Sequence, residues 1–357
     1  MKKFRIILLS GLCSLLPIAT ASGQETGRSL NSKGSDAYKE QDYITAVSYF
    51  LQAAKQYDNA EAQYNLGMCY YNGQGIPQNY EKAIHWFRLS AEKGNNEAQW
   101  FLGNCCVNGT IINQDYTEAV KWYHKAAKQG NGKAQYGLGI CYFDGKGVSQ
   151  DYEEAVYWYR LAAEQGFANA QYNLGLCYLK GDGVARSYEE AVYWFRLAAE
   201  QGGADVQYHL GICYYEGKGV RQDYKEAVYW FSLAAEQGVP EAQFNLSIIY
   251  SDGNGVPQSD EKAFYWCRLA AEQGHSEAQH RLGLNYTLGK GVPQNNENAF
   301  FWYRKAAEQG LPEAQYFLGV CYEAGHGVRR SNSEALKWIS KAAAQGDKLA
   351  IEWLMQN

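Results

Sequence analysis

Residues 134–166 read AQYGLGICYFDGKGVSQDYEEAVYWYRLAAEQG, and this stretch decides the fold because the chain repeats it with a period of 36 residues. Its opening dipeptide, Ala134-Gln135, returns at positions 62, 98, 170, 242, 278 and 314, and as Val206-Gln207 in the remaining copy. A fixed period of this length indicates a repeat architecture in which each unit packs on the next. We therefore expect eight full repeats over residues 60–347.

Each repeat has the pattern of two helices joined by a short loop. In the first helix, Leu66, Gly67 and Tyr70 share one face of a helical period. The second helix follows a residue whose side chain can accept hydrogen bonds from free backbone N–H groups. These predicted N-cap residues are Asn79, Asp115, Asp151, Ser187, Asp223, Ser259, Asn295 and Ser331. The second helix ends at Gly94 and its equivalents through Gly346, which fits a left-handed residue after a helix.

Glycine also stands inside the first helix, at positions 67, 103, 139, 175, 211, 283 and 319, and Ser247 is the exception. Glycine inside a helix costs about 1 kcal/mol relative to alanine. A cost borne in seven repeats predicts that another helix approaches too closely for a Cβ atom. The loops carry Gly-x-Gly without the strand and third glycine of a phosphate site, so we assign these glycines to turns. The second repeat has Ile111 instead, and its loop should differ in shape.

The N-terminus carries the pattern of a signal peptide. Lys2, Lys3 and Arg5 precede a short apolar run at 6–16, and Ala19-Thr20-Ala21 supplies small residues for cleavage. We expect residues 1–21 to be removed, the mature chain to be exported to the periplasm or secreted, and no stable membrane insertion. The formal charge of −5 and the absence of a Lys/Arg cluster argue against nucleic acid as a partner.

Over residues 60–347 the repeats are variants of the pattern Ala-Gln-Tyr-x-Leu-Gly-x-Cys-Tyr-x-x-Gly-x-Gly-Val-x-Gln-Asp-Tyr-x-Glu-Ala-Val-x-Trp-Tyr-x-x-Ala-Ala-Glu-Gln-Gly. This pattern resembles the Sel-1-like repeat of the tetratricopeptide superfamily. The resemblance implies an all-α fold, a right-handed superhelical solenoid of helix-loop-helix repeats that acts as a scaffold or adaptor for proteins. For exported bacterial members it also implies host interaction or envelope signalling. Residues 22–59 resemble one tetratricopeptide-like hairpin, and residues 348–357 are expected to form a C-terminal capping segment.

By analogy with tetratricopeptide arrays, the first helices line the concave face, where peptides bind. The first candidate column on that face is Tyr64, Trp100, Tyr136, Tyr172, Tyr208, Phe244, His280 and Tyr316. The second candidate column is Tyr71, Val107, Phe143, Leu179, Tyr215, Ser251, Thr287 and Glu323. Aromatic side chains dominate binding hot spots, but for the first column we favour the alternative that the rings pack repeat against repeat. The second column varies more and is the better candidate for a ligand surface. A third stripe on the second helices, Tyr157, Tyr193, Tyr229, Tyr265 and Phe301, is a candidate convex contact.

The alternative function is a cell-wall-active serine enzyme of the penicillin-binding or β-lactamase type, which some cysteine-rich members of the family suggest. Ser259-Asp260-Glu261-Lys262 matches Ser-x-x-Lys, but Ser259 also occupies an N-cap position and no companion motif appears. The cysteines at one repeat position lie too far apart for mutual bridges, so we expect small buried apolar residues. We expect no catalytic site, no cofactor and no metal, because no pair of cysteines has ligand spacing.

Overall fold

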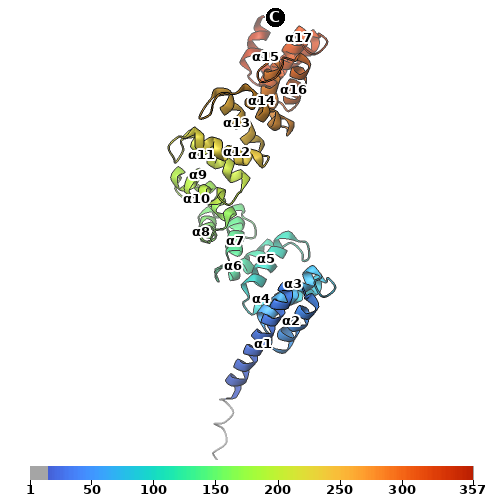
Figure 1. Cartoon of the computed structure of the whole chain (residues 1–357), viewed down its shortest axis with the longest axis vertical. Coiled ribbons are helices and arrows are strands. Elements are labelled where there is room, and N and C mark those ends of the chain that lie inside the picture. The colour runs from blue at the N-terminus through green and yellow to red at the C-terminus, as the bar shows by residue number, and fades with distance from the viewer. Residues whose placement is uncertain (1–14, 357) are drawn as a thin grey trace, which may run out of the picture. The chain divides into compact units, whose positions relative to one another are not determined.

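The computed structural model describes the chain over residues 15–356, with side chains from residue 22 onward. In that range the regular structure consists of nineteen helices and contains no strand (Figure 1). The helices divide into two compact units, one formed by residues up to 177 with 181–185, the other by 178–180 and residues from 186 onward. The expectation of an all-α chain of paired helices is confirmed.

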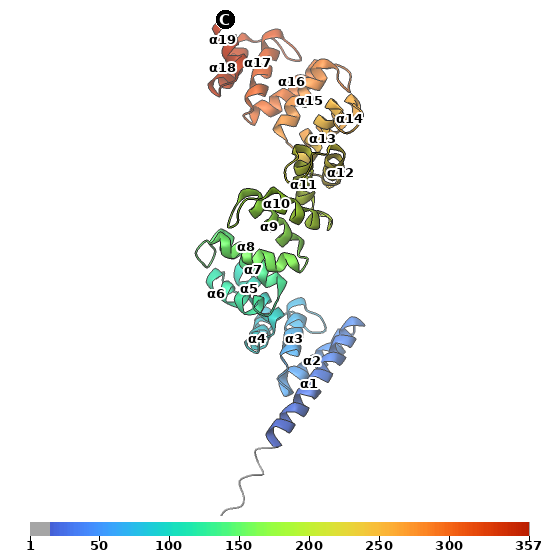
Figure 2. The same ribbon diagram turned by 90° about the vertical axis from the view of Figure 1, so that its left-hand side faces the viewer.

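The first unit comprises α1 (Leu15–Lys39), α2 (Tyr43–Gln56), α3 (Ala60–Asn72), α4 (Tyr80–Glu92), α5 (Asn96–Asn108), α6 (Tyr116–Ala127), α7 (Gly132–Asp144), α8 (Tyr152–Glu164) and most of α9 (Ala168–Lys180). The second unit comprises α10 (Tyr188–Ala199), α11 (Ala204–Glu216), α12 (Tyr224–Glu236), α13 (Pro240–Asp252), α14 (Asp260–Glu272), α15 (Ser276–Leu288), α16 (Asn296–Glu308), α17 (Pro312–Ala324), α18 (Asn332–Ala344) and α19 (Lys348–Gln356). Within each unit, helices that are consecutive in sequence pack side by side, as α11 and α12 do in Figure 2. From α3 to α18 the odd-numbered helices are the first helices of the repeats and the even-numbered ones are the second helices.

The predicted helix ends are confirmed. At all eight N-cap positions the side chain accepts a hydrogen bond from a backbone N–H of the first turn. Asp151, for example, accepts from the N–H of Glu154 at 3.0 Å. The glycines that follow the second helices, from Gly94 to Gly346, have φ between +86° and +99°, a region that residues with a Cβ atom rarely occupy. Local chemistry therefore sets where each second helix begins and ends.

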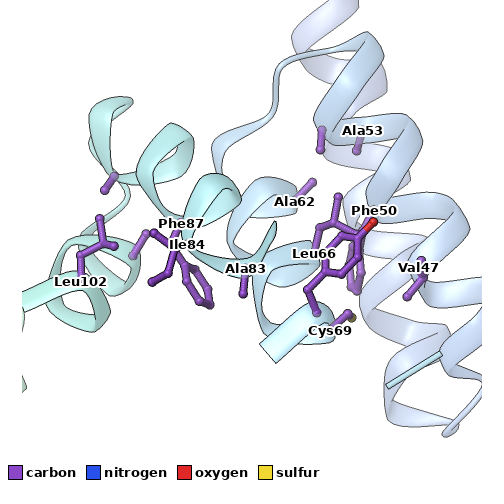
Figure 3. Close-up of a cluster of buried hydrophobic side chains, with 14 of the residues drawn as sticks. Val47, Phe50, Ala53, Ala62, Leu66, Cys69, Ala83, Ile84, Phe87 and Leu102 are labelled. Carbon is purple, nitrogen blue, oxygen red and sulfur yellow. The ribbon is translucent and has the colours of Figure 1, made fainter. Parts of the chain in front are cut away.

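The glycines inside the first helices lie directly against a side chain of the second helix, which is Ile339 at Gly319 and an aromatic ring at Gly67, Gly103, Gly139, Gly211 and Gly283. A Cβ atom on Gly67 would lie 2.7 Å from the ring of Phe87, and one on Gly211 would lie 2.6 Å from the ring of Phe231. Ordinary contacts of Cβ atoms are 3.4–4 Å, so the ring occupies the volume of the missing side chain. The prediction of a close helix approach is confirmed, and Figure 3 shows Phe87 within this core.

The Ala-Gln signature forms a ladder of buried amides. Gln243 donates from Nε2 to the carbonyl of Ala235 at 3.0 Å, across the turn between α12 and α13. Its Oε1 accepts from Nε2 of Gln273, at the end of α14, at 2.8 Å. Equivalent bonds join Gln135 to Gln165 and Gln315 to Gln345. One buried amide thereby ties together three consecutive helices.

The cysteines of the described residues are buried thiols, as expected. Eight of them are buried and form no disulfide: Cys69, Cys105, Cys106, Cys141, Cys177, Cys213, Cys267 and Cys321. Burial raises the pKa of Cys69 and of Cys213 to about 11, so these thiols stay protonated near neutral pH. Cys13 lies outside the described residues.

The two ends of the array close its core. In the N-terminal hairpin, a Cβ atom on Gly34 would lie 2.6 Å from the ring of Phe50, the same packing as in the repeats. At the other end, Ala350 of α19 is fully buried against the core of α18, and Trp353 donates from Nε1 to Glu323 at 3.0 Å. The predicted signal peptide at 1–21 falls largely outside the described residues. Over the described range, no helix combines the length and the apolar character needed to cross a bilayer.

Candidate functional site

The first candidate column packs mainly within its own repeats. Tyr64 lies half-buried with its ring centroid 5.8 Å from that of Phe87, and Tyr136 lies 6.0 Å from Tyr159 in the same way. Burial, with a smaller contribution from Glu97, raises the pKa of Tyr64 to about 12. These rings connect the first helix of a repeat to its second helix, and their half-exposed edges remain on the first-helix face.

The second candidate column lies where the loop leaves the first helix. Phe143 is half-buried, and its ring centroid lies 5.0 Å from that of Tyr152, at the start of the second helix. Tyr215 stands in the same relation to Tyr224, at 5.4 Å. The remaining members of this column, Tyr71, Val107, Leu179, Ser251, Thr287 and Glu323, are also half-buried. The column therefore presents partly exposed side chains whose identity changes from repeat to repeat.

The two columns meet in a pocket of about 340 Å³ in the first unit. Trp100 and Tyr136 of the first column and Val107 of the second line it, together with Ile140 of α7. The other predicted site residues, Tyr64, Tyr71, Phe143, Tyr172, Leu179 and Tyr215, do not line this pocket. Its volume lies within the range of small-ligand sites, which are concave and mostly apolar.

Nine residues of the pocket wall were not predicted as site residues from the sequence. They are Asn104, Tyr116, Tyr123, Lys133, Gly137, Ile140, Cys141, Lys146 and Phe167. The signal was present in the sequence, because at several of these positions the third repeat departs from the other copies. At 137, for example, the other repeats carry Asn65, Phe101, Asn173, His209, Asn245, Arg281 and Phe317. The missing side chain at Gly137 opens the space between α5 and α7.

Two ammonium groups stand at the pocket. Lys133 Nζ lies 4.4 Å from the centroid of the Trp100 ring and 3.3 Å from Glu97 Oε2. Lys146 Nζ lies 2.7 Å from Asp144 Oδ2. Both lysine side chains are about half exposed, at 48% and 49%, so these ion pairs are screened by solvent.

The stripe on the second helices is the most exposed aromatic feature. In the second unit the side chains of Tyr193 and Tyr229 are 55% and 54% exposed, and Tyr157 in the first unit is 52% exposed. Each ring leans on the tryptophan that follows it, with centroids 5.0 Å apart for Tyr193 and Trp194. This stripe presents separate rings on separate helices, and none of the three rings lines the pocket.

The Ser-x-x-Lys match has the geometry of a helix cap. Ser259 Oγ accepts from the backbone N–H of Lys262 at 3.2 Å and donates to Glu261 Oε2 at 3.1 Å. The Lys262 ammonium lies 5.2 Å from the centroid of the Tyr250 ring. Both side chains are accounted for by local packing. Among the described residues, no group of three His, Cys, Asp or Glu side chains could hold a metal ion.

Comparison with known proteins identifies the repeat. The Sel1 repeat profile matches residues 27–58, 60–95, 96–131, 132–167, 168–203, 204–239, 240–275, 276–311 and 312–347. The first of these matches covers the segment for which the sequence predicts a tetratricopeptide-like hairpin.

Two solved structures share the fold over nearly the whole chain. The antigen c5321 of uropathogenic Escherichia coli, a protective antigen with an SLR fold, is 35% identical, with a TM-score of 0.78, over 94% of this chain and 80% of its own. A Sel1 repeat protein from Oxalobacter formigenes is 33% identical, with a TM-score of 0.65, over 100% of this chain and 97% of its own. The expected solenoid of helix-loop-helix repeats is thereby confirmed.

Similarity to curated proteins is partial. The Helicobacter pylori protein named "Putative beta-lactamase HcpC" is 33% identical over 79 residues, which is 22% of this chain and 26% of that protein. The mouse DAP3-binding cell death enhancer 1 is 43% identical over 54 residues, which is 15% of this chain and 10% of that protein. The chain thus spans about a quarter or less of the curated relatives that it matches.

Proposed function

This chain belongs to the Sel1 repeat family, and from that premise we propose that it binds a protein or peptide on the concave face formed by its first helices. The scaffold fold of Sel1 repeats is typical of protein–protein interaction. The observation that carries the proposal is the pair of half-buried columns on the first helices, whose members Trp100, Tyr136 and Val107 converge on the pocket between α5 and α7. Half-exposed aromatic side chains beside a pocket are the arrangement found at binding hot spots.

Export and a role in host interaction or envelope signalling are part of the same proposal. They are supported by the signal-peptide pattern at residues 1–21 and by the likeness to c5321, itself a protective antigen. Expression of the full chain in a Gram-negative host, followed by fractionation and N-terminal sequencing, tests this. We expect mature protein that begins at Ser22 in the periplasm or the medium. Uncleaved protein confined to the cytoplasm would refute the export proposal.

The binding proposal is tested by affinity capture from periplasm and host-cell lysate, followed by measurement of the affinity of the purified partner. The test variant carries threonine at Tyr71, Phe143, Leu179 and Tyr215, because Thr287 shows that threonine fits this column. The matched control carries threonine at four exposed rings of the second helices, Tyr157, Tyr193, Tyr229 and Tyr265. Both variants should keep the helical circular dichroism of the parent chain.

We expect the first-helix variant to lose the partner and the second-helix control to keep it. Loss in the control alone would overturn the placement of the site and move it to the second helices. Equal capture by the parent chain and by both variants would contradict the proposed surface altogether.

A further inference from the structure

The pocket between α5 and α7 depends on Gly137 and Val107, two residues that no other repeat carries at the same positions. Gly137 leaves open the space that an Asn, Phe, His or Arg side chain fills in the other repeats. Val107 is smaller than Tyr71 and Tyr215 at the same position. A Cβ atom on Gly137 would already lie 2.9 Å from the Tyr123 ring. Two reductions in side-chain size therefore meet in one place.

Phe167 lines the pocket from a position where other repeats have a helix-capping side chain. Phe167 is the N-cap residue of α9 and makes no side-chain capping bond, whereas Asn95 and Asn131 at the equivalent positions do. Gly203, Val239 and Leu311 in later repeats also lack this bond, but none of them is aromatic. Its ring lies on Gly132, where a Cβ atom would be 2.1 Å from the ring. Losing a capping side chain normally destabilises a helix. Here Phe167 adds a further aromatic side chain to a lining that already contains Trp100 and Tyr136.

One charged position at the pocket, that of Lys133, has the opposite sign to most of its equivalents in the other repeats. Lys133 is the only basic residue of its column, whose other members are Glu61, Glu97, Asn169, Asp205, Glu241, Glu277 and Glu313. Lys146 stands at the same pocket. Each ammonium is held by one exposed carboxylate, a weak pairing that a ligand carboxylate can replace. Both charged residues that line the pocket are lysines, in a chain whose formal net charge is −5.

We propose that this pocket receives an aromatic side chain of an acidic peptide segment, with the ring between Trp100, Tyr136 and Phe167 and a carboxylate at Lys133 and Lys146. The inference rests on the proposed peptide-binding function and names the chemistry that the site selects. Aromatic walls favour an aromatic guest through offset and edge-to-face ring contacts. The two lysines select an anion and reject a cation.

Three indole probes of nearly equal shape test the chemistry directly. Indole-3-propionate carries a carboxylate, 3-methylindole is neutral and tryptamine carries an ammonium group. Their dissociation constants are measured by ligand-observed NMR on the full mature chain. We expect indole-3-propionate to bind roughly three- to ten-fold tighter than 3-methylindole, as two exposed ion pairs allow, and tryptamine to bind most weakly.

Variants of the pocket separate shape from charge. Gly137→Asn installs the side chain found at three equivalent positions, and Val107→Tyr closes the same space from α5 if the first variant does not fold. Either should weaken the binding of all three probes at least tenfold. Ser251→Tyr makes the equivalent change in the second unit and should leave binding unchanged. Lys133→Glu restores the usual charge of its column and should abolish the preference for the anion.

Equal affinity of the three probes, no binding by any of them, or binding that survives both closing variants would overturn the proposal. These results can be told apart from failure of the proposed function. If the probes fail while the threonine variant of the second column still loses its protein partner, the scaffold function stands and only the ligand chemistry is wrong.

Discussion

A serine at Gly211 should destabilise the fold, and loss of the ring at Phe231 should cancel that effect. A Cβ atom at Gly211 would lie 2.6 Å from the Phe231 ring. The ring has no free space to move into because it is fully buried. Overpacking of this kind costs about 1–3 kcal/mol, reduced by roughly 0.5 kcal/mol because serine favours a helix more than glycine does. The expected loss in the free energy of unfolding for Gly211→Ser is therefore about 0.5–2.5 kcal/mol.

One repeat of the chain has a side chain in place of the glycine and a smaller residue in place of the ring. In the repeat where Ser247 replaces the glycine, Cys267 replaces the ring, and both side chains are fully buried. Phe231→Cys alone should cost about 2–4 kcal/mol, because it leaves a cavity. In the double variant the serine fills part of that cavity, so we expect it to be no less stable than Phe231→Cys alone.

Urea unfolding followed by circular dichroism measures the stability of the parent chain, the two single variants and the double variant, which together form a double-mutant cycle. The midpoints are compared where the dependence of the free energy of unfolding on urea concentration has the same slope. A double variant whose loss equals the sum of the single losses would refute the reasoning, since the two positions would then be independent. The reverse exchange is the control: Cys267→Phe should be destabilising with Ser247 present and tolerated together with Ser247→Gly.

Three further predictions concern the ladder, the thiols and the capping serine. Gln243→Ala removes the partner of the Ala235 carbonyl and should lower the free energy of unfolding by about 1–3 kcal/mol in urea titrations, more than the same change at an exposed glutamine. Burial raises the pKa of Cys213 from 9.0 to about 11, so the unfolded chain loses this proton at a lower pH than the folded chain and the free energy of unfolding should fall between about pH 9 and pH 11. At pH 11 this loss should be smaller by roughly 2 kcal/mol in Cys213→Ala than in the parent chain. Equal pH profiles of the two proteins would count against the buried thiol. Ser259→Ala should cost about 0.5–2 kcal/mol through loss of its cap, and a fluorescent penicillin should label neither form, whereas labelling that depends on Ser259 would revive the serine-enzyme hypothesis.

The sequence alone determined the architecture, because its evidence is local. The N-cap residues, the left-handed glycines and the apolar period act within a few residues of chain, so the bounds of the second helices could be predicted from residues such as Asp151 and Gly166. Repetition of these signals at one period then required stacked hairpins.

Only the tertiary structure decided which columns meet. The sequence predicted a close approach at Gly211 but not that Phe231 fills the space, and it placed Trp100 and Tyr136 on one face without showing the pocket beside them. Contacts between residues some 20 to 36 positions apart depend on how the helices cross and rotate. The period of the repeat does not specify how the helices cross. Particular residues, such as Gly137, Phe167 and Lys133, set the shape and the charge of the pocket wall.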